Sequence, residues 1–268
     1  MEYSISFPEE YQEKEELVKY SIFTVMNSGY VYGNFGRIFV NSIHRNLDIS
    51  KIDTIYIGDI GLSEKDKEFL NSFEKVKIVD SGVVTENVVI HDDDWVESVN
   101  QKTILLKELC KTSDCPIVLI DLDCYFVNDF YQHIDLDYDI QVVERDPWVH
   151  PNHIASWVVI NNMEKGVRFI DEWMNIMKNY TATRHKESPS LDILVKDNFN
   201  RNEYKVKVSK ERKIIGFGEL RQIEEWESHI AHFKGWARGS SPEEDFYLRV
   251  FGKGRHPIHE IIEEWINV

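Results

Sequence analysis

Segments with the pattern of β-strands alternate along this chain with segments that have the pattern of α-helices. Alternation of this kind is typical of a mostly parallel sheet with helices on both faces, because parallel neighbours need a long crossover between them. We therefore expect an α/β fold that forms one domain over residues 1–268. The expected strands are 20–27, 53–60, 76–80, 116–123, 139–145 and 155–162, and the expected helices are 36–47, 63–73, 99–111 and 164–180.

The most apolar of these strands ends in two aspartates. Four aliphatic residues, 117–120, lead directly into Asp121, and Asp123 follows one residue later. On an extended chain, side chains two residues apart leave on the same side. Two carboxylates at such a short distance repel each other unless a positive charge lies between them. Their oxygen atoms are hard ligands, which suit Mg²⁺ or Mn²⁺. Ligands bind at the carboxyl ends of strands in open α/β sheets, so the pair predicts a metal site there.

Composition limits the partners of this chain. The formal net charge is −16, which argues against a nucleic-acid surface and against an anionic membrane surface. No apolar run has the roughly 20 residues that a membrane-spanning helix needs. Three cysteines, an odd number without paired spacing, indicate a reducing compartment, and we expect a cytoplasmic protein.

An aliphatic strand that ends in Asp-x-Asp about a hundred residues into the chain resembles the GT-A glycosyltransferases. The segment "HIAHFKGWARG", residues 229–239, is similar to the His-Phe-x-Gly motif of their retaining family 8 branch. The resemblance implies a Rossmann-like GT-A fold in which His232 joins Asp121 and Asp123 as a third metal ligand. It also implies that Lys234 and Gly235 lie beside the donor phosphates. His229 is the competing histidine.

The resemblance extends to the donor pocket. The segment "NSGYVYG" after the first strand is similar to the family's nucleotide-base pocket, with Asn27 where an Asp is usual. Either Tyr30 or Tyr32 then stacks on the base. Lys102 stands where many GT-A enzymes carry a basic residue that reaches the donor phosphates.

Beyond the metal strand, "NHIASWVVINN" is similar to the family's strand that lines the donor sugar. Ser156 would face that sugar, and Asp192 would position the sugar or the acceptor. An inverting enzyme needs a carboxylate base near the acceptor hydroxyl, for which Glu144 and Asp146 are both candidates. The stereochemistry stays open at this point.

The resemblance implies a Mn²⁺- or Mg²⁺-dependent transfer of a sugar from a nucleotide-sugar donor, with UDP favoured, to a glycan or another hydroxyl acceptor. One alternative is a phosphatase of the haloacid-dehalogenase type, which also ends a strand in Asp-x-Asp. Against it, Tyr125 stands where that family has Thr or Val, and the motif lies far from the N-terminus. The other alternative is a sugar-binding domain without catalysis.

Overall fold

The computed structural model describes residues 18–28, 30–84, 93–182, 186–217 and 228–232. The strands are β1 Tyr20–Met26, β2 Ile52–Asp59, β3 Val76–Asp80, β4 Ile117–Ile120, β5 Cys124–Phe126, β6 Ile140–Glu144, β7 His153–Ile160, β8 Val206–Lys210, β9 Ile215–Phe217 and β10 Ile230–His232. The α-helices are α1 Tyr30–Asn46, α2 Glu64–Asn71, α3 Asp93–Cys110, α4 Met163–Asn179, α5 Glu187–Arg201 and α6 Glu211–Ile214. Two 3₁₀ turns, η1 Ile49–Lys51 and η2 Tyr131–His133, complete the described elements.

The central sheet has seven strands in the order β3-β2-β1-β4-β7-β6-β8. β1, β2, β3 and β4 are parallel to one another, and β6 is parallel to β8. β7 is antiparallel to both of its neighbours, so the sheet is mostly parallel, as predicted. The strand order reverses beside β1, between β2 and β4, and this is where open α/β sheets bind ligands.

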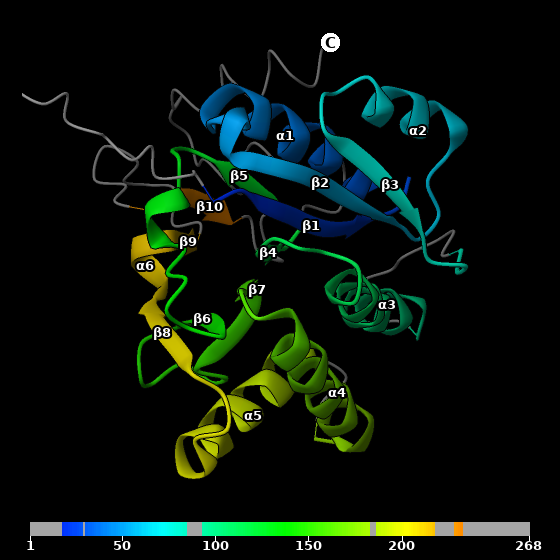
Figure 1. The fold of residues 1–268 in the computed structure, drawn as a ribbon. Coiled ribbons are helices and arrows are strands. Elements are labelled where there is room, and N and C mark those ends of the chain that lie inside the picture. The colour runs from blue at the N-terminus through cyan, green and yellow to red at the C-terminus, as the bar shows by residue number, and fades with distance from the viewer. Residues whose placement is uncertain (1–17, 29, 85–92, 183–185, 218–227, 233–268) are drawn as a thin grey trace, which may run out of the picture.

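Helices cover both faces of the sheet, as Figure 1 shows. One core cluster joins β1 and β2 to α1 through side chains such as Phe39 and Ile43. A second cluster on the other face joins β4 and β7 to α3, α4 and α5 through side chains such as Leu106 and Trp173. None of the described helices is long and apolar enough to cross a membrane.

A small second sheet lies beside the first, in the order β5-β10-β9. Its β5 strand is anchored to α1, because the Phe126 backbone N–H donates to Ser42 Oγ (3.2 Å) and Asn46 Nδ2 donates to the Phe126 carbonyl (2.7 Å). The anchor fixes the chain immediately after the two aspartates, so it also fixes where they lie.

Each expected strand and helix has a counterpart in the structure; β3 has the expected bounds, and the others have at least one shifted end. Ser63 caps α2, since its Oγ accepts from the Asp66 N–H at 3.2 Å. The extended chain expected through Asp123 is wrong. β4 ends at Ile120, and the chain bends so that Leu122 packs into the core before β5 begins.

Candidate metal centre and donor site

Three side chains meet at the carboxyl end of β4. His232 Nε2 lies 3.0 Å from Asp123 Oδ1 and 3.6 Å from Asp121 Oδ2. Asp123 and His232 are buried, and Asp121 is partly exposed. The structure thus brings together the three residues predicted to bind a metal ion, although 109 positions separate Asp123 from His232 in the chain.

Strand pairing produces this convergence. β10 runs antiparallel to β5 with His232 opposite Cys124, which places the imidazole beside Asp123. On the other side, the Asp121 backbone N–H donates to the Ser156 carbonyl at 3.3 Å and so continues the β4–β7 ladder. His229 lies at the far end of this pairing, where its ring contacts His133 with centroids 4.7 Å apart.

The donor set fits a hard divalent cation. Two carboxylates and one imidazole nitrogen are ligands that Mn²⁺ and Mg²⁺ accept in proteins, and both carboxylates lie within 3.6 Å of the same imidazole nitrogen. A fourth side chain near these ligands, the buried Cys124, was not among the predicted ligands. Its Sγ lies within 4.8 Å of ligand atoms of Asp123 and His232. A thiolate suits softer metals, so Cys124 does not alter the expectation of a hard ion.

Lys102 contacts the first aspartate. Its Nζ lies 2.6 Å from Asp121 Oδ1 and 2.7 Å from Glu187 Oε1, and only 6% of the lysine side chain is exposed. Burial alone would lower the pKa of the Lys102 ammonium, but Asp121 and Glu187 outweigh burial and raise it. Burial raises the pKa of Glu187 to about 7, against the opposing effect of Lys102. Sequence analysis predicted Lys102 in the site and missed Glu187.

Asp192 lies in a second polar cluster, on α5. Asp192 Oδ1 accepts from His153 Nδ1 at 2.8 Å, and Oδ2 accepts from Lys196 Nζ at 2.7 Å. Burial alone would raise the pKa of Asp192, but the hydrogen bonds from Lys196 and His153 hold it below its usual range. Burial lowers the pKa of His153, and Asp192 only partly offsets this. His153 begins β7, so the cluster lies at the same edge of the sheet as Asp121.

Glu144 ends β6 at this edge, where it is opposite His153 and accepts a hydrogen bond from Lys210 Nζ at 2.5 Å. The next residue, Arg145, pairs with Glu211, whose carboxyl oxygen lies 3.5 Å from the Arg145 Nε. Burial raises the pKa of Glu211 to about 7, and Arg145 and then His232 oppose the shift. Sequence analysis named neither Arg145 nor Glu211.

The remaining predicted donor residues are placed only in part. Asn27 is buried directly after β1, and Ser156 is buried in β7. Tyr30 and Tyr32 belong to the first turn of α1, but their side chains lie outside the described residues. Lys234 and Gly235 also lie outside the described residues.

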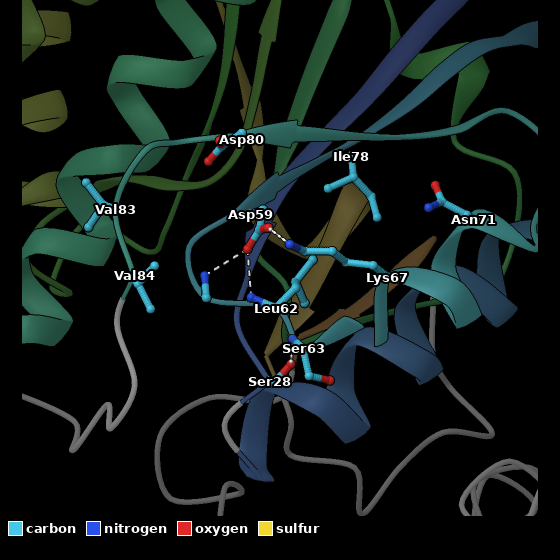
Figure 2. A pocket seen from close by; sticks show the side chains of 11 residues that line it. Ser28, Asp59, Leu62, Ser63, Lys67, Asn71, Ile78, Asp80, Val83 and Val84 are labelled. Atoms are coloured by element: carbon cyan, nitrogen blue, oxygen red, sulfur yellow. Dashed lines mark hydrogen bonds and ion pairs between the residues drawn. The ribbon is translucent and has the colours of Figure 1, made fainter. Parts of the chain in front are cut away.

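A pocket of about 690 Å³ opens at the carboxyl ends of β1, β2 and β3. Asp59 occupies its centre in Figure 2, where it accepts from the Gly61 and Leu62 N–H groups and pairs with Lys67 Nζ at 3.0 Å. Ser28, which follows β1, and Asp80, which ends β3, form opposite walls. The lining includes none of the three predicted metal ligands, but β1 is the immediate neighbour of β4, so the two sites share one edge of the sheet.

The sequence profile of a family described as nucleotide-diphospho-sugar transferase matches residues 70–236. Among solved structures, the galactosyltransferase LgtC in complex with donor and acceptor sugar analogues aligns over 93% of this chain and 97% of its own, with a TM-score of 0.57 and 12% identity. A glycosyltransferase involved in glycosylation of the major capsid of PBCV-1 aligns over 82% of this chain and 95% of its own, with a TM-score of 0.53 and 9% identity. GlyE, a glycosyltransferase of Streptococcus pneumoniae TIGR4, aligns over 93% of this chain and 63% of its own, with a TM-score of 0.55 and 12% identity. No curated protein matches the sequence significantly.

Proposed function

Because this chain belongs to the nucleotide-diphospho-sugar transferase family, we propose that it moves a sugar from a nucleoside-diphosphate donor, with UDP favoured, to a hydroxyl group of a glycan or similar acceptor. The transfer depends on Mn²⁺ or Mg²⁺ and retains the anomeric configuration. Family membership makes the chain a glycosyltransferase rather than a phosphatase of the haloacid-dehalogenase type. The three free cysteines support our further proposal that the protein acts in the cytoplasm.

The observation that carries the metal dependence is the convergence of Asp121, Asp123 and His232 at one strand end. A bound divalent ion would act there as a Lewis acid toward the charge that develops on the leaving diphosphate. Asp121 Oδ2 and Asp123 Oδ1 would hold the ion from the protein side together with His232 Nε2. A neutral imidazole suits this place, because two aspartates and a diphosphate already supply negative charge.

Other side chains would hold the donor. Asn27 and one of the two tyrosines, Tyr30 or Tyr32, would bind the base, and Ser156 would line the sugar. Lys234 and Gly235 would lie against the phosphates. The pocket around Asp59 adjoins this region along the sheet edge, and its carboxylates, Asp59 and Asp80, would accept hydrogen bonds from hydroxyl groups of the donor.

Asp192 would orient the sugar or the acceptor through a carboxylate that His153 and Lys196 hold in place. With retention, no carboxylate base needs to face the acceptor from the opposite side of the sugar. If the reaction instead inverts the configuration, Glu144 is the candidate for the base, since it lies at the same edge of the sheet as Asp192.

The test is a panel of UDP, GDP, CDP and dTDP sugars, each incubated with and without Mn²⁺, in which release of the nucleoside diphosphate is measured. We expect one family of donors to turn over, only with metal, and NMR of the glycoside to show the donor's anomeric configuration. Turnover that EDTA leaves unchanged would contradict the metal dependence. Binding of a donor without any turnover, with every acceptor tested, would favour a sugar-binding domain.

A further inference from the structure

A chain of three charged side chains, with the buried Lys102 in the middle, connects α5 to the metal centre. Glu187 pairs with Lys102, and Lys102 pairs with Asp121. We propose that Glu187 is a positioning residue for metal binding, which acts through Lys102 on the orientation of Asp121. This inference rests on the proposed function, because it concerns the same metal centre.

The two oxygens of Asp121 have different partners. Oδ1 accepts a hydrogen bond from Lys102 Nζ at 2.6 Å, and Oδ2 faces His232 Nε2 at 3.6 Å. A carboxylate held by one oxygen cannot rotate without breaking a charge-assisted hydrogen bond, which is among the stronger hydrogen bonds in proteins. Lys102 therefore keeps Oδ2 turned toward the histidine, where a metal ion would bind.

Glu187 is itself held firmly. It opens α5, its carbonyl accepts from Trp173 Nε1 at 2.9 Å, and Trp173 is fully buried in the core. Ser188, the next residue, accepts at Oγ from the Ala155 N–H of β7 at 3.1 Å. The start of α5 is thus fixed to α4 and to the sheet before the Glu187 side chain reaches Lys102.

Lys102 needs this second carboxylate to keep its place. Its flexible four-carbon chain lies on α3, and two carboxylates from two other elements hold the ammonium at 2.6 and 2.7 Å. Only 6% of the Lys102 side chain and 14% of the Glu187 side chain are exposed. Water therefore competes little with Glu187 for the hydrogen bonds of the Lys102 ammonium. The structure therefore favours an indirect role for Lys102, through Asp121, over the direct phosphate contact expected from the resemblance.

The double variant Lys102→Met/Glu187→Gln tests the proposal, because it removes one positive and one negative charge together and so keeps the net charge of the cluster unchanged. The matched control is Lys107→Met/Asp171→Asn, which removes a lysine–carboxylate pair that joins α3 to α4 at 2.5 Å but lies near the surface. Mn²⁺ affinity is measured by calorimetry with UDP present, alongside the melting temperature and the Mn²⁺ concentration that gives half-maximal turnover.

We expect the double variant to bind Mn²⁺ about 10–100-fold more weakly, as for other residues that orient a metal ligand, and the control to bind as the unaltered protein does. Saturating Mn²⁺ should restore most of the turnover, which loss of structure alone would not allow. Unchanged Mn²⁺ affinity in the double variant would overturn the proposal. If the double variant does not fold, the single variant Glu187→Gln is used instead. We expect it to bind Mn²⁺ more weakly by the same factor, and an unchanged Mn²⁺ affinity would overturn the proposal.

Asp121→Asn separates this inference from the proposed function. Loss of Mn²⁺ binding in Asp121→Asn, with normal binding in the double variant, rejects only the role of Glu187. Normal Mn²⁺ binding in Asp121→Asn rejects the metal centre itself, and the role of Glu187 with it.

Discussion

Two buried aspartate–histidine pairs lie at the same edge of the sheet. In one, Asp123 Oδ1 lies 3.0 Å from His232 Nε2, and in the other, Asp192 Oδ1 lies 2.8 Å from His153 Nδ1. The geometry of the two pairs is similar, and both histidines are almost fully buried. What differs is the third charged group at each pair.

At His232 the third group is another carboxylate, Asp121, at 3.6 Å, whereas at Asp192 it is the ammonium of Lys196, at 2.7 Å. With Lys102 on Asp121 and Glu187 on Lys102, the first cluster has three carboxylates to one ammonium, and the second has one of each. A divalent ion lowers the free energy of the first arrangement far more than that of the second. The same pair of residue types can therefore bind a metal in one place and orient a substrate group in the other.

The largest expected effect comes from Asp123→Asn, which removes a ligand charge while keeping the shape of the side chain. We expect turnover with Mn²⁺ to fall on the order of 10³-fold, because Lewis-acid stabilisation of the leaving group amounts to several kcal/mol. Nucleotide release from the preferred sugar donor measures this. Activity close to that of the unaltered protein, in a variant with a normal melting temperature, would show that the first cluster is not the metal centre.

Asp192→Asn should separate the two clusters. We expect turnover to fall about 100-fold, as a misplaced substrate group would cause, while the affinity for Mn²⁺ stays within about twofold. The matched control is Asp171→Asn, an exposed helix aspartate. A loss of Mn²⁺ affinity in Asp192→Asn would mean that the second cluster also contributes to metal binding.

The second cluster, Asp192 with His153 and Lys196, should also contribute to the decrease in unfolding free energy at acid pH. Burial lowers the pKa of His153 in the folded protein below the ordinary value of about 6.5, so the unfolded chain binds more protons in this range. The contribution of neutral His153 is therefore fully present above pH 6.5 and is lost as the pH falls below it. We expect His153→Gln to flatten the decrease in unfolding free energy between pH 7 and pH 5, measured by urea denaturation. An unaltered slope would contradict the burial of a neutral imidazole.

The smallest expected effect is that of Cys124→Ala. Although its thiol lies within 4.8 Å of ligand atoms of Asp123 and His232, a hard ion has little preference for it. We expect Mn²⁺ affinity to change less than about twofold, and this is measured by the same calorimetry. A large loss of affinity, or a preference for Zn²⁺ that disappears with the thiol, would indicate that Cys124 is a ligand.

Much of the fold follows from local patterns in the sequence. The apolar run 117–120 predicts a buried strand, and helical spacing predicts α4 to within one residue at each end. The same spacing predicts α1 only from Gly36, six residues after the helix begins. The direction of β7 does not follow from its own residues. It depends on the connection from β6, which is a short loop over 145–152 and not a crossover helix, so the two strands are antiparallel.

The site was predictable to the extent that its signals are local. The apolar strand directly before Asp121 and Asp123 indicates their position at a strand end. His232 was predicted only through a family motif, because it reaches the site through the pairing of β10 with β5, which are far apart in the sequence. Glu187 had no signal at all. It is an ordinary acidic residue in the sequence, and no helix was expected after it. The structure has α5 there, with Pro189 in the first turn, where proline is compatible with a helix.

The most direct test of the central claim is a calorimetric titration of Mn²⁺, with UDP present, on His232→Ala, His153→Ala and His229→Ala. The account predicts at least about a tenfold loss of Mn²⁺ affinity in His232→Ala, and unchanged affinity in the other two. The His153→Ala variant tests the comparison of the two clusters, and His229→Ala tests the choice between neighbouring histidines of the same segment. Unchanged affinity in His232→Ala, with a loss in either of the others, would contradict the assignment of the metal centre.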